Sequence, residues 1–121
     1  MGQLLGWILD GSIRIEYVTA ERPQLYFRNR PLKCYLNEQG GRNRIFGGRR
    51  YRWSIKADGK VRRVVCSKLV WMYVERKTVP EGSHIHHGCF GSLYDGYFNL
   101  TCLTVEEHHA IHYGSSSQED F

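Results

Sequence analysis

The last part of the chain, residues 78–121, contains no lysine and no arginine. Residues 1–77 hold all seventeen lysines and arginines, from Arg14 to Lys77, and six acids, which gives this part a formal charge of +11. Residues 78–121 hold the other six acids, for a charge of −6, and all six histidines of the chain. A basic block of this size favours attraction to a polyanion, most often nucleic acid. A solvated basic face without a partner is the alternative.

The sequence also lacks long hydrophobic runs and paired cysteines. No segment approaches eighteen apolar residues, and residues 1–12 have neither a basic start nor a small-residue cleavage site. We therefore expect no membrane span, no secretory signal and a cytoplasmic location. The four cysteines form no C-x-x-C pair, which argues against a zinc ribbon and against a dense disulfide framework.

Hydrophobic patterning predicts a strand-rich first part, residues 1–66. Apolar and polar residues alternate over residues 12–18, the pattern of a half-buried strand, and residues 25–27 and 33–36 are weaker strand candidates separated by Pro31. Residues 37–50 hold four glycines and four arginines without periodicity, which favours a basic loop. Residues 51–55 and 61–65 flank Asp58-Gly59, a strong signal for a β-hairpin.

The second part, residues 67–114, is expected to contain two helices and two short strands. Ser67 is a candidate N-cap for a helix over residues 67–76, with Leu69, Val70, Tyr73 and Val74 at helical spacing. Residues 83–87 and 100–104 are short strands around the glycine-rich loop 89–98. Thr104 and Glu107 match a capping box at the start of a helix that ends at Gly114. With a polar tail, residues 115–121, the chain is predicted to be a small α+β protein.

The spacing of the histidines is suited to metal binding. His108 and His112 are four residues apart, so both project from one face of the final helix and can hold one ion, while His109 points about 100° away. In an extended segment, His84 and His86 share one side and His87 takes the other. The alternative for His108 and His112 is a pair of surface histidines on an amphipathic helix.

From Ser67 to Tyr113 the sequence resembles the HNH endonucleases, particularly the small homing endonucleases of bacteriophage genomes. The resemblance rests on SKLVW, the helix before the site, on VPEGSHIHH, the approach to its first strand, on FNL, and on LTVEEHHAIH, the closing helix. The HNH letters fall on His87, Asn99 and His108. The resemblance implies a ββα-metal fold and hydrolysis of a phosphodiester bond in DNA.

Carried over by position, the resemblance implies that His87 is the general base and that His86, His108 and possibly His112 bind one divalent metal ion. Asn99 would tie the loop to the strand and orient the base. Many members carry Asp or Asn before the base, where this chain has His86. Mg or Mn is the expected working metal, although ligation by imidazoles alone favours Zn, Ni, Co or Mn in affinity. No small-molecule cofactor is expected.

Two cysteines leave another kind of metal site open. Cys89 and Cys102 lie close enough in sequence to the histidines to form a closed structural zinc site with them. His87 would then have no catalytic task.

The basic block upstream is expected to hold double-stranded DNA against the acidic site. Glu106, Glu107 and Asp95 would repel phosphates, and the cations would offset this repulsion by contacts that give affinity without reading sequence. Nine cations are the candidates: Arg42, Arg44, Arg49, Arg50, Arg52, Lys56, Lys60, Arg62 and Arg63. The sequence thus favours a metal-dependent DNA endonuclease. The alternatives are a DNA-binding or regulatory module that keeps a structural metal without catalysis, and an HNH nuclease that acts nonspecifically or on RNA.

Overall fold

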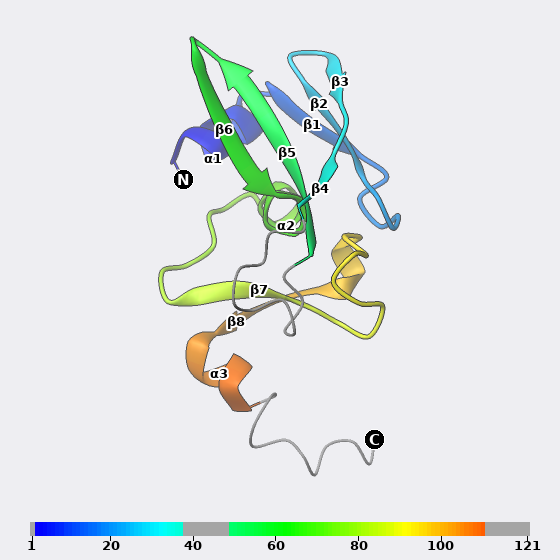
Figure 1. Cartoon of the computed structure of the whole chain (residues 1–121). Helices are drawn as coiled ribbons and strands as arrows, with labels where there is room; N and C mark the ends of the chain where they lie inside the picture. The colour runs from blue at the N-terminus through cyan, green and yellow to red at the C-terminus, as the bar shows by residue number, and fades with distance from the viewer. Residues whose placement is uncertain (1, 38–48, 111–121) are drawn as a thin grey trace.

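The computed structural model describes residues 2–37 and 49–110 and has both helices and strands, which confirms the predicted α+β class (Figure 1). The elements in chain order are α1 (Gly2–Leu9), β1 (Ile13–Glu16), β2 (Gln24–Phe27), β3 (Arg30–Leu32), β4 (Tyr35–Asn37), β5 (Arg50–Ala57), β6 (Lys60–Val65), α2 (Cys66–Glu75), β7 (Ser83–His87), the 3-10 helix η2 (Tyr97–Asn99), β8 (Leu100–Thr104) and α3 (Val105–His109). Within this part of the chain, no helix is long and apolar enough to cross a membrane.

The first sheet has the order β1-β2-β3, with antiparallel neighbours. The prediction that Pro31 separates two strands is wrong, because Pro31 lies within β3 and pairs with Tyr26. β3 is an edge strand, where the missing N–H of a proline is tolerated. The reversal occurs at Arg28-Asn29, whose φ angles of 50° and 68° are both positive, as in a type I′ turn.

The second sheet has the order β4-β5-β6 and contains the predicted hairpin. Asp58 and Gly59 form its turn with φ angles of 55° and 76°. Trp53 and Ile55 alternate with polar residues along β5 and are buried in the core, at 1% and 0% exposure. The predicted loop over residues 37–50 falls mostly on residues 38–48, which lie outside the described residues.

α2 packs against α1, β1, both strands of the hairpin and β7, and so forms the centre of the fold (Figure 1). It begins at Cys66, and its N-cap is Val65 without a side-chain cap, so the assignment of Ser67 as N-cap is wrong. Ser67 is buried in the first turn instead. Arg76 ends the helix in the left-handed conformation and donates its N–H to the carbonyl of Met72 over 2.7 Å.

The buried face of α2 also differs from the predicted one. Leu69 and Val70 are buried as expected, but Trp71 and Met72 are buried with them, whereas Val74 is 37% exposed. A helix surrounded on several sides buries more than the single stripe that a spacing argument identifies. α1, which the sequence analysis does not predict, covers this core with Leu4, Trp7 and Ile8.

β7 and β8 are the two short strands predicted at residues 83–87 and 100–104; they pair as a separate antiparallel hairpin, and α3 follows directly. The pairing sets His86 opposite Thr101 and His87 opposite Leu100. The capping box is confirmed: the Thr104 hydroxyl accepts from the N–H of Glu107 at 3.1 Å, and the Glu107 carboxylate accepts from the N–H of Thr104 at 2.8 Å. The predicted end of this helix at Gly114 lies outside the described residues.

Candidate functional site

His87, the last residue of β7, pairs with a carboxylate that is almost completely buried. Its Nε2 lies 2.9 Å from Oδ1 of Asp95, and the two side chains are only 6% and 1% exposed. The other carboxylate oxygen of Asp95 is buried and has no hydrogen-bond partner among the described residues. Asp95, which the sequence analysis names only as one of three acids that repel phosphates, is thus buried and its carboxylate faces the imidazole inside the protein.

Asn99 closes the loop between β7 and β8, residues 88–99, which we call the site loop. Its Oδ1 accepts from the N–H of Phe90 at 3.2 Å, and its Nδ2 donates to the carbonyls of Gly91 and Tyr94 at 3.1 and 2.9 Å. The backbone carbonyl of Asn99 accepts from Gly88 at 2.7 Å. The side chain is 4% exposed, so these bonds are shielded from water. Asn99 thus ties the loop to the hairpin.

The site loop also docks on the connection between β1 and β2. The N–H of Asp95 donates to the carbonyl of Glu21 at 2.9 Å, and that of Tyr97 donates to the carbonyl of Val18 at 2.6 Å. Gly96 lies so close to this connection that a Cβ atom there would be 2.5 Å from the carbonyl oxygen of Thr19. The N-terminal sheet therefore fixes the backbone that carries Asp95, and the identity of residue 96 is set by this approach.

The predicted metal ligands are only partly described. His86 lies on β7 with its side chain on the opposite face from His87, as the strand geometry requires. His108 lies on α3, but the placement of its side chain, like His112 as a whole, is outside the described part of the chain. Among the described residues, no three His, Cys, Asp or Glu side chains gather closely enough to hold a metal ion.

The cysteines do not join His87 in a cluster. Cys89 is exposed in the site loop, whereas Cys102 is half-buried on β8, opposite Ile85, and packs against the core. Burial raises the pKa of the Cys34 and Cys66 thiols, so both stay protonated and are poor metal ligands at neutral pH.

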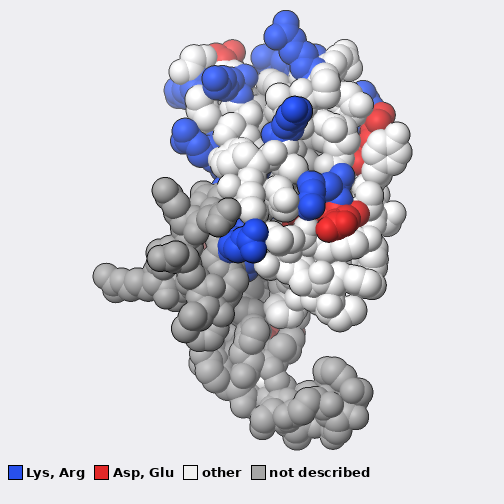
Figure 2. All heavy atoms as spheres, turned by 45° about the vertical axis from the view of Figure 1, so that its right-hand side comes forward, with Lys and Arg blue, Asp and Glu red and all other residues white. Residues whose placement is uncertain are grey.

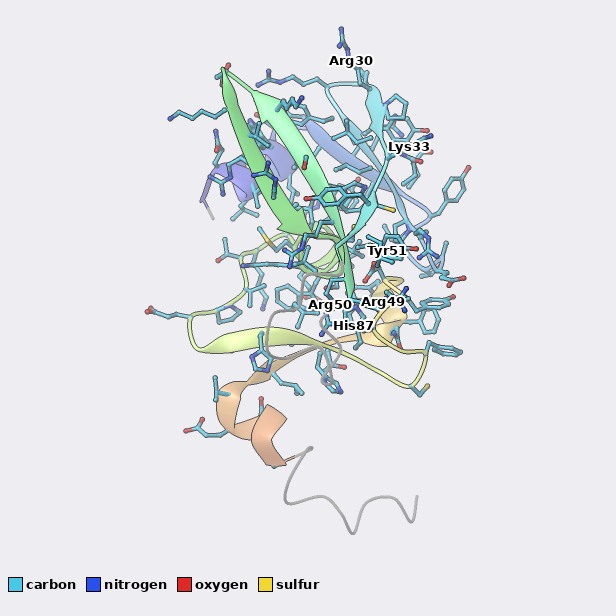
Figure 3. The ribbon with its side chains drawn as sticks, in the orientation of Figure 1. Arg30, Lys33, Arg49, Arg50, Tyr51 and His87 are labelled. Atoms are coloured by element: carbon cyan, nitrogen blue, oxygen red, sulfur yellow. The ribbon has the colours of Figure 1, made fainter. Side chains whose placement is uncertain are left out.

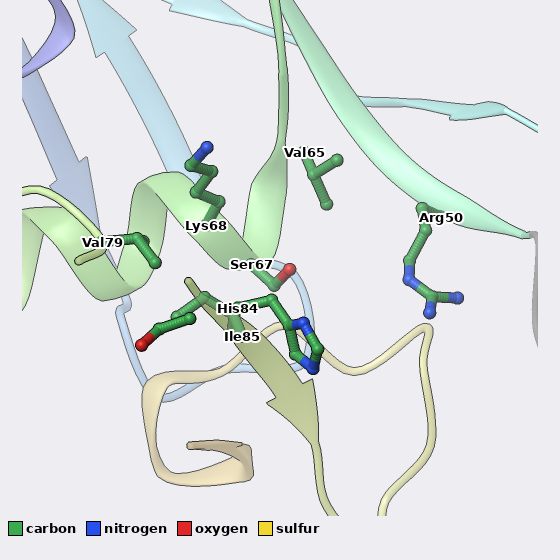
Figure 4. A pocket seen from close by; sticks show the side chains of 8 residues that line it. Arg50, Val65, Ser67, Lys68, Val79, His84 and Ile85 are labelled. Carbon is green, nitrogen blue, oxygen red and sulfur yellow. The ribbon is translucent and has the colours of Figure 1, made fainter. Parts of the chain in front are cut away.

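A pocket of about 210 Å³ opens beside the hairpin, between the start of β5, the first turn of α2 and β7 (Figure 4). The side chains of Arg50, Ser67 and His84 point toward the same opening in this view. Burial lowers the pKa of the Arg50 guanidinium, and the carboxylate of Asp95 nearby opposes this shift. The guanidinium therefore borders the pocket and is close enough to Asp95 to feel its negative charge.

The candidate DNA-binding cations are distributed over two faces of the β5–β6 hairpin. On the face shown in Figure 2, Lys and Arg side chains stand mainly over the upper part of the molecule, which holds the two three-stranded sheets. Strand alternation and register place Arg50, Arg52, Lys56 and Arg63 on one face, which we call the basic face. Lys60 and Arg62 belong to the other face, and Arg62 donates to the side chain of Gln3 at 3.1 Å.

Of the candidate cations that the structure describes, Arg49 and Arg50 lie beside the site. Figure 3 shows both beside His87, where β5 begins, whereas Arg30 and Lys33 lie farther from it, toward the top of the view. The carbonyl of Arg49 accepts a 3.5 Å hydrogen bond from Ser92 of the site loop, which supports this placement. Arg42 and Arg44 lie outside the described residues. The candidate cations that lie on the β5–β6 hairpin are thus divided between its two faces.

The residue that sequence reasoning missed is Asp95. It is the only acidic residue between Glu81 and Glu106 in the sequence. This isolation could have identified it as the partner of His87. The site is therefore a buried histidine and carboxylate pair on a docked hairpin, next to arginines and followed by a capped helix that carries His108.

No protein-family model, no curated protein and no solved structure matches this chain.

Proposed function

We propose that the protein is a metal-dependent DNA endonuclease of the HNH kind, which hydrolyses a phosphodiester bond with a site formed by β7, the site loop, β8 and α3. The observation that carries this proposal is the contact between His87 and the buried Asp95 at the end of β7. Antiparallel β7 and β8 followed directly by α3 also give the ββα order that the resemblance to HNH endonucleases implies. Action on DNA would take place in the cytoplasm.

His87 is suited to act as a general base because one ring nitrogen is already occupied. When the Nε2–H donates to the carboxylate of Asp95, the proton of the neutral imidazole is fixed on Nε2, and Nδ1 is left as an acceptor. Nδ1 then accepts the proton of the water that attacks phosphorus, and Asp95 stabilises the imidazolium that forms. The arrangement needs no movement of His87, because its partner is held in place by the site loop.

In this proposal, imidazole side chains would hold the metal ion. His86 next to the base in sequence, His108 on α3 and His112 later in the sequence would hold the ion, and α3 packs against both β7 and β8. When bound, a divalent ion polarises a phosphate oxygen and stabilises the leaving oxygen. Mg or Mn is the proposed working metal, and Zn, Ni or Co would be held at least as tightly by imidazoles.

The basic face and Arg49 supply the DNA contacts in this scheme. Guanidinium groups bind phosphates in a bidentate manner, and such contacts position a duplex without reading its sequence. Arg50 differs from the other cations because it lies near both Asp95 and the pocket bordered by Ser67 and His84. A phosphate beside Arg50 would therefore lie next to the proposed base.

The test is cleavage of supercoiled plasmid, and of DNA from the protein's own genomic neighbourhood, with Mg, with Mn and with chelator. The wild type should cut with metal and not with chelator, and His87→Ala should not cut while it keeps its fold. Leu103→Ala, a half-buried position on the neighbouring strand, is the control for general damage to the hairpin and should keep cutting. Cleavage by His87→Ala at the wild-type rate would remove His87 from the mechanism.

The second candidate function is a DNA-binding module without catalysis. The low exposure of His87, 6%, favours this candidate, because a buried histidine and aspartate pair can also serve only to hold a loop. A folded wild type that binds DNA and cuts none, with any of the metals, would establish this second function instead.

A further inference from the structure

Three aromatic side chains of the site loop form an exposed cluster that the function proposed above does not use. The ring centroid of Phe90 lies 5.2 Å from that of Tyr94 and 5.4 Å from that of Phe98, and Tyr94 and Phe98 are also 5.4 Å apart. Phe90 is 57% exposed and Phe98 is 53% exposed. Large apolar side chains that gather in solvent instead of in the core indicate a surface that binds something.

The cluster is held in place by the hydrogen bonds of Asn99. Phe90 donates its N–H to the Asn99 side chain, Tyr94 offers its carbonyl to the same side chain, and Phe98 directly precedes Asn99 in the chain. The tyrosine hydroxyl of Tyr94 also lies 3.5 Å from the carbonyl oxygen of Thr19. The rings therefore project from a loop that is already ordered, so a partner does not have to supply the free energy of ordering it.

Arginines flank the cluster. Arg22 donates to the carbonyl of Leu93 at 3.1 Å, and the backbone of Arg49 accepts a hydrogen bond from Ser92 at 3.5 Å. Arg22 also stacks over the ring of Tyr51, with 4.0 Å between the guanidinium carbon and the ring centroid. Its ion pair with Glu21, at 3.7 Å, is exposed and therefore weak. Exposed rings bordered by guanidinium groups match the two surfaces of nucleic acid, the faces of the bases and the phosphates.

We propose that Phe90, Tyr94 and Phe98 form an aromatic wedge that enters the stacked bases of bound DNA and unstacks a base step next to the cleaved phosphate. This inference rests on the proposed function, since it takes DNA as the partner. Apolar side chains inserted between base pairs kink a duplex, and aromatic rings then replace part of the lost stacking. Phe90 follows His87 by three residues and Tyr94 directly precedes Asp95, so a base step opened by the wedge lies beside the proposed base.

The test uses short duplexes that carry 2-aminopurine at successive positions, bound in the presence of chelator so that no cleavage occurs. The fluorescence of 2-aminopurine rises when it is unstacked, and anisotropy of a dye on the same duplex gives the affinity. Four proteins are compared: the wild type, Phe90→Ala with Phe98→Ala, Phe90→Tyr with Phe98→Tyr, and Leu9→Ala. Leu9 is 61% exposed on α1 and serves as the control for loss of exposed apolar surface. Circular dichroism checks that each variant is folded.

The wild type should raise the 2-aminopurine signal at a limited set of positions. The double alanine variant should lose this rise and bind roughly tenfold more weakly or worse, as expected when base stacking on two rings is removed. The double tyrosine variant should retain the rise, because it keeps both rings, and Leu9→Ala should behave as the wild type. A double alanine variant that unstacks DNA as well as the wild type would overturn the wedge.

The failure of the wedge can be distinguished from the failure of the proposed nuclease. If the wild type cuts plasmid and the double alanine variant unstacks DNA normally, the wedge is wrong and the nuclease stands. If the wild type unstacks DNA through these rings and never cuts, the wedge stands and the nuclease is wrong. If the variant leaves the DNA response unchanged and instead abolishes a dimer in sedimentation, the rings bind a second copy of the chain and the wedge is wrong.

Discussion

The body of the molecule and its C-terminal hairpin are stabilised in different ways. Of the buried apolar residues in the described part of the chain, only Leu100 lies beyond Met72, so the core is built by α1, the two three-stranded sheets and α2. The hairpin β7–β8 and its site loop instead depend on the pair of His87 and Asp95 and on the hydrogen bonds of Asn99. The polar groups of the proposed site are thus held by polar contacts, next to a body that supplies the stability.

The two regions meet at the connection between β1 and β2. The carbonyls of Val18 and Glu21 accept hydrogen bonds from the site loop, and Gly96 fits against Thr19 and Ala20. This contact means that the position of Asp95, and through it the orientation of His87, depends on a segment more than seventy residues earlier in the sequence. A hairpin with little core of its own needs such a support.

The largest effect is expected from Trp53→Ala in the body. Trp53 is 1% exposed at the centre of the core, so its truncation should lower the free energy of unfolding by about 3–5 kcal/mol. Leu103→Ala, at a half-buried position of the β7–β8 hairpin, should lower the free energy of unfolding by less than about 1.5 kcal/mol. Urea denaturation of both variants measures the difference. Equal losses in the free energy of unfolding would mean that the β7–β8 hairpin contributes a core of its own.

Asn99→Ala should cost about 2–3 kcal/mol, because it removes three partly buried hydrogen bonds of the site loop and leaves the N–H of Phe90 and the carbonyl of Tyr94 without this partner. The loss should be local. In hydrogen exchange, the amide of Phe90 should exchange faster by orders of magnitude, while the amide of Ile55 in β5 should change only as far as global stability falls. Uniform acceleration of all amides would show instead that Asn99 stabilises the whole fold.

Gly96→Ala should disturb the contact between the two regions. The new Cβ would lie 2.5 Å and 2.7 Å from the carbonyl oxygens of Thr19 and Ala20, which are backbone atoms, so the site loop has to shift at a cost of about 1–3 kcal/mol. Gly6→Ala in the exposed face of α1 meets no atom within 4 Å and should be neutral or slightly stabilising. DNA cleavage should fall in the first variant and persist in the second. A Gly96→Ala protein with full activity would show that the site tolerates this displacement.

The smallest effect is expected for DNA binding by the β5–β6 hairpin, where the neighbouring residues Arg62 and Arg63 point to opposite faces. Arg63→Ala removes a cation from the basic face and should weaken DNA binding a few-fold, with the slope of log affinity against log salt reduced by about 1. Arg62→Ala, on the face that contacts Gln3, should leave this slope unchanged. Fluorescence anisotropy at several salt concentrations makes the comparison. Equal slopes for the two variants would remove the distinction between the faces.

Local signals in the sequence were sufficient for the β5–β6 hairpin and for the start of α3. Asp58-Gly59 and the capping box of Thr104 and Glu107 act over a few residues, and the structure confirms both. Features set by distant contacts were missed or wrong. The helix α1, the turn at Arg28-Asn29 and the burial of Ser67 depend on packing against other elements. The pairing of Asp95 with His87 was not predicted for the same reason. Its burial against His87 follows from the docking of the site loop on the β1–β2 connection.

The central claim is that His87 and Asp95 act as one catalytic unit, and a double-mutant cycle on the rate of DNA cleavage tests it most directly. His87→Ala should lower the rate by about 10²–10⁴-fold, and Asp95→Asn, which keeps the shape of the side chain, should also lower it strongly. The double variant should be no slower than His87→Ala alone, because Asp95 acts through the imidazole. Effects that multiply in the double variant, or a folded Asp95→Asn protein with the wild-type rate, would contradict the account.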